Sequence, residues 1–180
     1  ITFFSTRSGL DRGILQNEGF HFIAISGRGL PPRFSWGTFQ WAWYLFLSLF
    51  QVAWAFRKER PEIILAFGGY ISVAPVLIAK IYRIPIVLHE ANAILGRANR
   101  ILVRWSKIIC TTFPMDPGDP CHLRQFCGED RVYVTGLPIR EEFIGLEKMA
   151  CLHELELDPS LKVILVMGGS LGSKKVNDLV

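Results

Sequence analysis

The region from residue 61 to residue 104 repeats one pattern of apolar and polar positions twice. An apolar run over 63–67 stops at a turn, and helix-like spacing follows over 74–82. A second apolar run over 84–88 stops in the same way, and helix-like spacing follows over 94–105. A short strand, a tight turn and a helix form the repeating unit of an open parallel α/β sheet. The pattern therefore predicts an α/β fold.

Each of these two predicted strands ends at a cluster of polar or glycine residues. The first cluster is Gly68-Gly69-Tyr70-Ile71-Ser72, and the second is His89-Glu90-Ala91-Asn92. In open α/β sheets, ligands bind where strand C-termini meet helix N-termini, because unpaired N–H groups and the helix dipole point there. Both clusters are therefore candidate binding sites. The alternative is structural: Asn92 could cap the next helix, and His89 could bond to the backbone.

The same patterns continue along the rest of the chain. Strands are expected over 1–5, 20–25, 107–112, 131–135 and 162–167, and helices over 11–17 and 141–157. The last strand runs into a glycine-rich turn and a new helix start, which is typical of a further Rossmann-type domain. We expect an N-terminal domain over 1–138, then a linker and the start of a C-terminal domain over 139–180. Because the chain starts inside a strand and stops at a helix start, we expect a fragment.

Two further features could bind phosphate. The turn Gly168-Gly169-Ser170-Leu171-Gly172-Ser173 lets a ligand approach the backbone closely and offers the Ser170 hydroxyl at a helix N-terminus. Its spacing fits neither a Walker A loop nor the dinucleotide fingerprint, and such glycines also serve packing. Arg140 is either a surface arginine or, if it lies at a domain hinge, a phosphate ligand.

Residues 34–56 form an uncharged segment with ten aromatic side chains. Its length meets the roughly 20 residues that a membrane-spanning helix needs. Tryptophans in its middle and a weakly polar stripe along one side argue against spanning. Basic residues flank it, which favours an interfacial position on an anionic membrane. A buried core helix and a spanning helix stay open as alternatives. The expected membrane-associating side chains are Trp41, Trp43, Phe46, Phe50, Arg57 and Lys58.

Composition narrows the class of protein. The net charge of +4 is modest and the arginines gather beside aromatic residues, which disfavours a nucleic-acid partner. The four cysteines form no C-x-x-C pair. Cys121, His122, Cys127 and His153 do not have the spacing of a standard zinc finger, so we expect reduced thiols and no metal.

Four clusters in order resemble the MurG family of peptidoglycan N-acetylglucosaminyltransferases. They are FGGYIS, HEANAILGRANR, VTGLPIR and VILVMGGSLGSKKVN, against the family's approximate GGYxSGP, HEQNxxPGxxNR, GNPVR and GGSQGAxxxN. The resemblance covers nearly the whole chain and implies a GT-B fold of two Rossmann-like domains. It implies a hexosyltransferase of cell wall biogenesis, cell shape and cell division, peripheral on the cytoplasmic face of the inner membrane. Its reaction would transfer GlcNAc from UDP-GlcNAc to polyprenyl-diphospho-muramyl-pentapeptide, turning lipid I into lipid II.

The resemblance also implies roles for single residues. Asn92, Arg140 and Ser170 would bind the UDP-GlcNAc donor, with His89, Glu90, Gly168 and Gly169 in support. The turn with Gly68, Gly69, Tyr70 and Ser72 would receive the acceptor's diphosphate. The transfer would invert the anomeric carbon without a metal or cofactor. The family's candidate general base is expected before residue 1, so the fragment alone is expected to be inactive.

The chain departs from the family pattern at several positions. Ala91, Leu137 and Leu171 stand where the family has amide side chains, Leu95 replaces a proline and Val73 a glycine. The losses at Ala91 and Leu137 put donor specificity in question. Two alternatives follow: a related GT-B transferase with another lipid acceptor such as diacylglycerol, or a non-catalytic, membrane-recruiting half of a split enzyme. The His-Glu-x-Asn element favours the peptidoglycan branch, and the 168–173 turn disfavours a recruiting half.

Overall fold

The structure is a computed structural model, and it describes residues 1–6, 10–31, 33, 35–114, 123, 129–166 and 178. The chain divides into two compact units, Ile1–Leu137 and Pro138–Val180. Several predicted features lie outside the described residues. These are the turn with Gly168, Gly169, Ser170 and Leu171, and the residues Cys121, His122 and Cys127.

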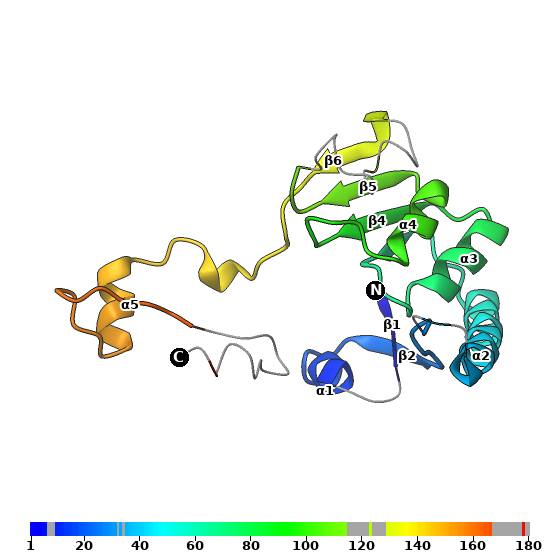
Figure 1. Cartoon of the computed structure of the whole chain (residues 1–180), viewed down its shortest axis with the longest axis horizontal. Helices are drawn as coiled ribbons and strands as arrows, with labels where there is room; N and C mark the ends of the chain where they lie inside the picture. Colours follow the sequence, from blue (N-terminus) through cyan, green and yellow to red (C-terminus); the bar gives the residue numbers. More distant parts are fainter. Residues whose placement is uncertain are drawn as a thin grey trace. The chain divides into compact units, whose positions relative to one another are not determined.

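The first unit contains two parallel sheets (Figure 1). In the smaller sheet, β1 (Thr2–Thr6) pairs with β2 (His21–Ile25). The larger sheet has the order β3-β4-β5-β6, formed by Ile64–Ala66, Ile86–Glu90, Ile108–Thr111 and Val132–Val134. All neighbouring strands run parallel. The predicted α/β fold is confirmed.

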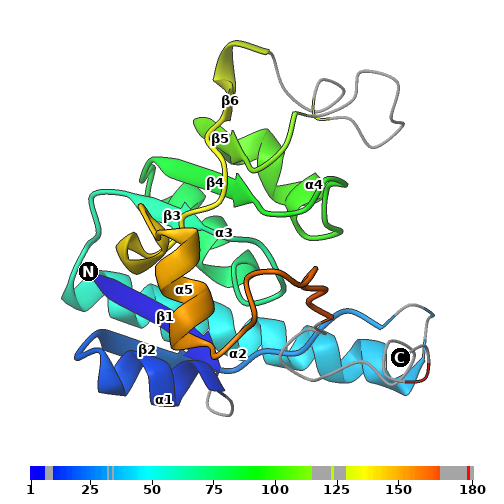
Figure 2. The same cartoon turned by 90° about the vertical axis from the view of Figure 1, so that its left-hand side faces the viewer.

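Helices cover one face of the larger sheet. They are α3 (Val73–Ile81) and α4 (Asn99–Leu102), with α2 (Trp36–Lys58) alongside α3 (Figures 1 and 2). The short helix α1 (Leu10–Asn17) packs on β1 and β2. Alternate strand residues such as Ile64, Leu88 and Ile109 point into the core shared with these helices, where they are buried.

The opposite face of the larger sheet carries apolar side chains that are exposed. They are Ile63 and Phe67 beside β3, Leu65 in β3, Ile108 in β5 and Tyr133 in β6. Parallel sheets are normally covered on both faces, and their strands are apolar on both sides for that reason. The strands thus have the apolar sequence of a sheet that is covered on both faces, whereas the described residues cover only one face.

The helix predicted over 94–105 begins later than expected. Residues 91–98 form a loop, and α4 starts at Asn99 and continues as a 3₁₀ turn over Val103–Trp105. The Glu90 carboxylate accepts the backbone N–H groups of Asn92 and Gly96, which fixes the loop in a non-helical path. Asn92 therefore does not cap the next helix, and that structural alternative was wrong.

The second unit differs more from the prediction. In place of a helix over 141–157 there is a 3₁₀ turn at Glu141–Phe143 and a helix α5 at Lys148–Glu154. Gly145 between them has φ +76°, a left-handed conformation that ends a helix. The buried strand predicted over 162–167 was also wrong, since residues 162–166 have no regular structure and 163–166 are exposed. A strand needs a neighbouring strand to pair with through backbone hydrogen bonds, and the described residues of this unit form no such strand.

Candidate functional site

The end of β4 places a carboxylate at the centre of a loop. The side chain of Glu90 is 1% exposed and accepts four hydrogen bonds. Oε1 accepts from the backbone N–H and the side-chain amide of Asn92 at 2.9 and 2.7 Å. Oε2 accepts from the Gly96 N–H at 2.9 Å and from the Asn99 amide at 2.8 Å. One acidic group thus holds both ends of the loop that follows the strand.

Two opposing effects act on the pKa of Glu90. Burial raises the pKa, because it disfavours the charged form. The hydrogen bonds from Gly96, Asn92 and Asn99 favour the carboxylate, and together they bring the pKa below its ordinary value of 4.5. Glu90 is therefore ionised at neutral pH, and its charge is spent on ordering the loop.

The same hydrogen bonds orient Asn92 at the surface of the site. Because its side-chain nitrogen donates to Glu90, its carbonyl oxygen is directed away from the carboxylate. The side chain is exposed, and no hydrogen bond to this oxygen forms within the part of the chain that the structure describes. Asn92 is thus held as a free acceptor of the kind that a sugar hydroxyl group can bind.

The turn after β3 joins this network through Asn99. Gly68 has φ +84°, and a Cβ atom there would lie 2.7 Å from both polar atoms of the Asn99 amide. Gly69 also has a positive φ, and the Ser72 hydroxyl donates to the Gly68 carbonyl. The loops after two neighbouring strands therefore meet at a single amide. The role of Asn99 was missed at the sequence level, although the Asn99-Arg100 pair stands in the motif.

His89 is buried on the other face of β4. Its Nε2 donates to the Gly136 carbonyl at 3.1 Å, since a carbonyl can only accept. Its ring lies 5.4 Å from that of Phe67. The structural alternative for His89, a hydrogen bond to the backbone, is what the structure shows, and this bond ties the end of β4 to the residues that follow β6.

The two other predicted donor-site residues are not brought to this loop by any described contact. Arg140 lies in the second unit, exposed, directly before the 3₁₀ turn at Glu141–Phe143. Ser170 is outside the described residues. The convergence of Arg140 and Ser170 with Asn92 stays a prediction.

Helix α2 exposes one continuous aromatic stripe. The helix turns about 100° per residue, so positions three and four apart share a face. Six aromatic residues at this spacing are between 50% and 76% exposed: Trp36, Phe39, Trp43, Phe46, Phe50 and Trp54. The Lys58 ammonium lies 3.8 Å from the centre of the Trp54 ring. Trp43, Phe46 and Phe50 are among the predicted membrane-associating side chains, and the other three follow from the same helical spacing. Trp41 is half-buried and off the stripe.

The polar side of α2 faces the protein instead of solvent. The Gln51 side chain accepts from the Ser26 N–H at 2.7 Å and donates to the Ser26 hydroxyl at 3.2 Å. The Gln40 carbonyl oxygen accepts from Arg28 at 2.7 Å. The helix thus turns its amides toward the end of β2 and its aromatic rings outward, so the fully buried placement of α2 was wrong. No helix in the described part of the chain is both long enough and apolar enough to span a bilayer.

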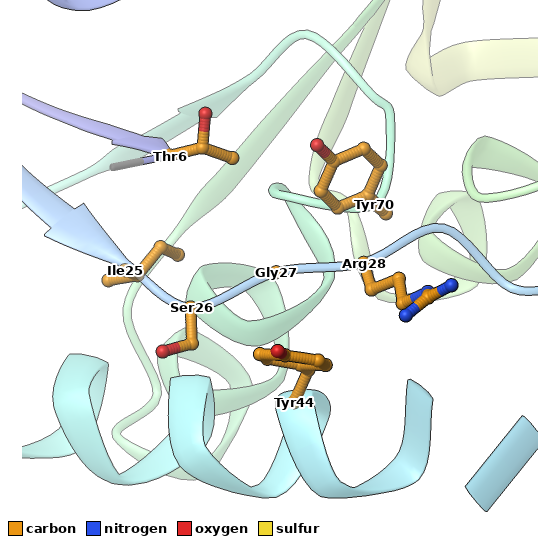
Figure 3. Close-up of a pocket in the computed structure, with 7 residues that line it drawn as sticks. All are labelled: Thr6, Ile25, Ser26, Gly27, Arg28, Tyr44 and Tyr70. Atoms are coloured by element: carbon orange, nitrogen blue, oxygen red, sulfur yellow. The ribbon is translucent and has the colours of Figure 1, made fainter. Parts of the chain in front are cut away.

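A pocket of about 560 Å³ opens between α2, the end of β2 and the turn after β3 (Figure 3). It is lined by Thr6, Ile25, Ser26, Gly27, Arg28, Tyr44 and Tyr70. For metals, by contrast, the described residues offer no group of three His, Cys, Asp or Glu side chains.

The chain is similar to known glycosyltransferases. Residues 1–111 match the glycosyltransferase family 28 N-terminal domain. The UDP-N-acetylglucosamine–N-acetylmuramyl-(pentapeptide) pyrophosphoryl-undecaprenol N-acetylglucosamine transferases of Clostridium kluyveri and Desulfitobacterium hafniense strain Y51 are 32% and 30% identical to it, over 100% and 98% of this chain. The alignments cover 49% and 46% of those relatives, so the chain spans about half their length.

A solved structure supports the fold. The crystal structure of Acinetobacter baumannii MurG is similar with a TM-score of 0.57 at 21% sequence identity, over 79% of this chain and 37% of that one. At this identity the likeness speaks for the GT-B fold, in agreement with the parallel sheets seen here. Together with the match over residues 1–111, these findings show that the chain belongs to glycosyltransferase family 28.

Proposed function

We propose that this chain is part of an enzyme that transfers GlcNAc from UDP-GlcNAc to a polyprenyl-diphospho-muramyl-pentapeptide. The observation that carries the proposal is the Glu90 network, which joins the loop after β4 to the glycine turn after β3 at the C-terminal edge of one parallel sheet. This edge is where α/β folds bind ligands. The names of the curated relatives support the donor and the acceptor.

On the donor side, Asn92 would bind the sugar. Its carbonyl oxygen is oriented by Glu90 and is available to a hydroxyl group. Arg140 and the Ser170 turn would contact the diphosphate from the second domain, which begins within 139–180. Cationic and N–H groups there would stabilise the negative charge of departing UDP in place of a divalent metal.

The reaction would be a direct displacement. The acceptor hydroxyl oxygen attacks the anomeric carbon from the face opposite UDP and forms the new C–O bond. The bond from that carbon to the diphosphate oxygen breaks, and UDP leaves with the electron pair. The hydroxyl proton goes to a base, and the anomeric configuration is inverted.

Neither polar residue at the end of β4 is suited to be that base. Glu90 is buried, and both its oxygens accept two hydrogen bonds within the loop. His89 is 4% exposed and faces Phe67 and Gly136. We assign both residues to support and neither to the role of base.

On the acceptor side, the turn with Gly68, Gly69, Tyr70 and Ser72 would receive the diphosphate. The aromatic stripe of α2 would rest on an anionic membrane, with Arg57 and Lys58 in the last turn near its head groups. Tryptophan and phenylalanine side chains at such exposure have a favourable place in the membrane interface. The enzyme would then be peripheral, on the cytoplasmic face of the inner membrane, where UDP-GlcNAc is available.

The test is a transfer assay with the full-length protein, UDP-GlcNAc and lipid I. We expect a product in which the transferred GlcNAc has the inverted anomeric configuration. We also expect kcat/KM to fall about 100-fold or more for Asn92→Ala and for Arg140→Ala. Full activity of both variants would overturn the site assignment. Transfer to diacylglycerol but not to lipid I would overturn the acceptor.

A further inference from the structure

We propose that the pocket beside Arg28 binds the diphosphate of a polyprenyl-linked ligand. This inference rests on the proposed function and adds residues at the ends of β1 and β2, and on α2, to the acceptor turn. The pocket lies at the C-terminal ends of two parallel strands, with Thr6 closing β1 and Ser26 following β2 (Figure 3). Strand ends of this kind form the ligand-binding edge of α/β sheets.

The described lining of the pocket carries a positive charge. Among the lining residues that the structure describes, Arg28 is the one charged residue and none is acidic. The guanidinium is held by a neutral group, the Gln40 carbonyl oxygen at 2.7 Å. Its remaining N–H groups are available to an anion, and a planar guanidinium suits phosphate oxygens.

The other polar groups of the lining are hydroxyls. The Ser26 oxygen accepts from Gln51, which leaves its own O–H as a donor. Tyr44 from α2 and Tyr70 from the turn after β3 add two phenol groups (Figure 3). A lining of one guanidinium and several hydroxyls favours a multiply charged oxyanion.

Gly27 allows the turn after β3 to form one wall. A Cβ atom at this position would lie 2.7 Å from Ile71 Cδ1 and 3.0 Å from Tyr70 Cε2. The Tyr70 ring therefore lies directly against the backbone of residue 27. This contact connects Arg28 to the turn that is expected to receive the acceptor.

The position of the pocket on α2 indicates what is attached to the phosphate. Gln40 and Tyr44 lie roughly 100° around the helix from the exposed aromatic stripe. Their sequence neighbours Phe39 and Trp43 belong to that stripe. An apolar chain against the stripe would therefore have its charged end within reach of the pocket, as a polyprenyl diphosphate requires.

The experiment measures binding of undecaprenyl diphosphate in neutral detergent micelles to the full-length protein. We expect Arg28→Gln to weaken binding about 10- to 100-fold, because a charge-assisted contact is lost. Gln40→Glu keeps the arginine but pairs it with a carboxylate, and we expect it to weaken binding as well. Arg104→Gln, an exposed arginine elsewhere, is the matched control and should bind as the parent protein does.

Three outcomes would overturn the inference. One is equal affinity of the Arg28→Gln and Arg104→Gln variants. Another is that Arg28→Gln weakens only the binding to vesicles that contain phosphatidylglycerol and not the binding of undecaprenyl diphosphate in micelles. The pocket would then bind a phospholipid head group. The third is that Arg28→Gln weakens the binding of inorganic diphosphate as much as it weakens the binding of undecaprenyl diphosphate, while the parent protein binds both ligands equally tightly. The polyprenyl chain would then contribute nothing to binding. Failure of the proposed function is separate: Arg28-dependent binding without GlcNAc transfer would leave this site standing.

Discussion

Asn99 donates its side-chain amide to the buried Glu90 carboxylate at 2.8 Å, and the same amide lies against the backbone of the glycine turn after β3. Glu90 and Asn99 are nine residues apart, and together they fix two loops that belong to neighbouring strands. The candidate site is thus ordered by a carboxylate that has no free oxygen for chemistry.

Replacing Glu90 by Gln should destabilise the first unit. Glutamine has nearly the same shape as glutamate, but its NH₂ group replaces one carboxylate oxygen. That NH₂ group would face N–H groups that donate to an oxygen in the parent protein. We expect the free energy of unfolding to fall by about 2–4 kcal/mol, as for a broken buried network around a charge. Denaturant unfolding measures it, with the exposed Glu62→Gln as control. Equal stability of both variants would contradict the role given to Glu90.

The stabilisation by Glu90 should depend on pH in one direction. Since the pKa of Glu90 is lowered on folding, the ionised group contributes its full stabilisation above the ordinary value of 4.5. The contribution is lost as the pH falls below 4.5 and through the folded-state pKa. The stability difference between the parent and Glu90→Gln should therefore be large at pH 7 and shrink on acidification. A difference that stays constant from pH 7 to pH 3 would exclude this linkage.

The two glycines of the turn after β3 form a matched pair of test sites. Both have positive φ, so alanine costs conformational energy at either position. At Gly68 the new Cβ would also meet the Asn99 amide, whereas at Gly69 nothing lies within 4 Å. Gly68→Ala should destabilise by about 1–3 kcal/mol more than Gly69→Ala in thermal or denaturant unfolding. The reverse order would contradict the contact with Asn99.

Removing rings from the α2 stripe should weaken membrane binding. We expect Trp43→Ser with Phe50→Ser to reduce co-sedimentation with anionic vesicles at least about tenfold, because two exposed aromatic side chains no longer enter the interface. The matched control is Ile81→Ser with Ile101→Ser, which removes exposed apolar residues elsewhere. Equal loss in both variants would indicate general stickiness instead of docking through α2.

The strands of the first unit could be predicted because each short apolar run ends at a glycine or polar cluster. Predicted boundaries at β2, β5 and β6 lie within one residue of the observed ones. The loop over 91–98 could not be predicted, because its apolar spacing is helical while a buried carboxylate, which no periodicity reports, holds its N–H groups. The run at 162–166 failed for the opposite reason, since an apolar segment becomes a strand only beside a partner.

The candidate site was predicted in part. Its positions at strand ends follow from the α/β pattern, and the orientation of Asn92 is consistent with the role given to it. The role of Glu90 could not be predicted. Its position after a strand would suit a reactive acid, but its four hydrogen bonds give it a structural role as a buried anion. The pocket at Arg28 escaped the sequence because its members come from segments up to 64 residues apart, Thr6 and Tyr70.

The face of the larger sheet that the described residues leave exposed has a practical consequence for purifying these 180 residues. Ile63, Leu65 and Phe67 present greasy side chains to water in a row. Such a surface promotes self-association, so a purified sample should scatter light, bind a fluorescent hydrophobic dye and stay dispersed only when detergent shields it.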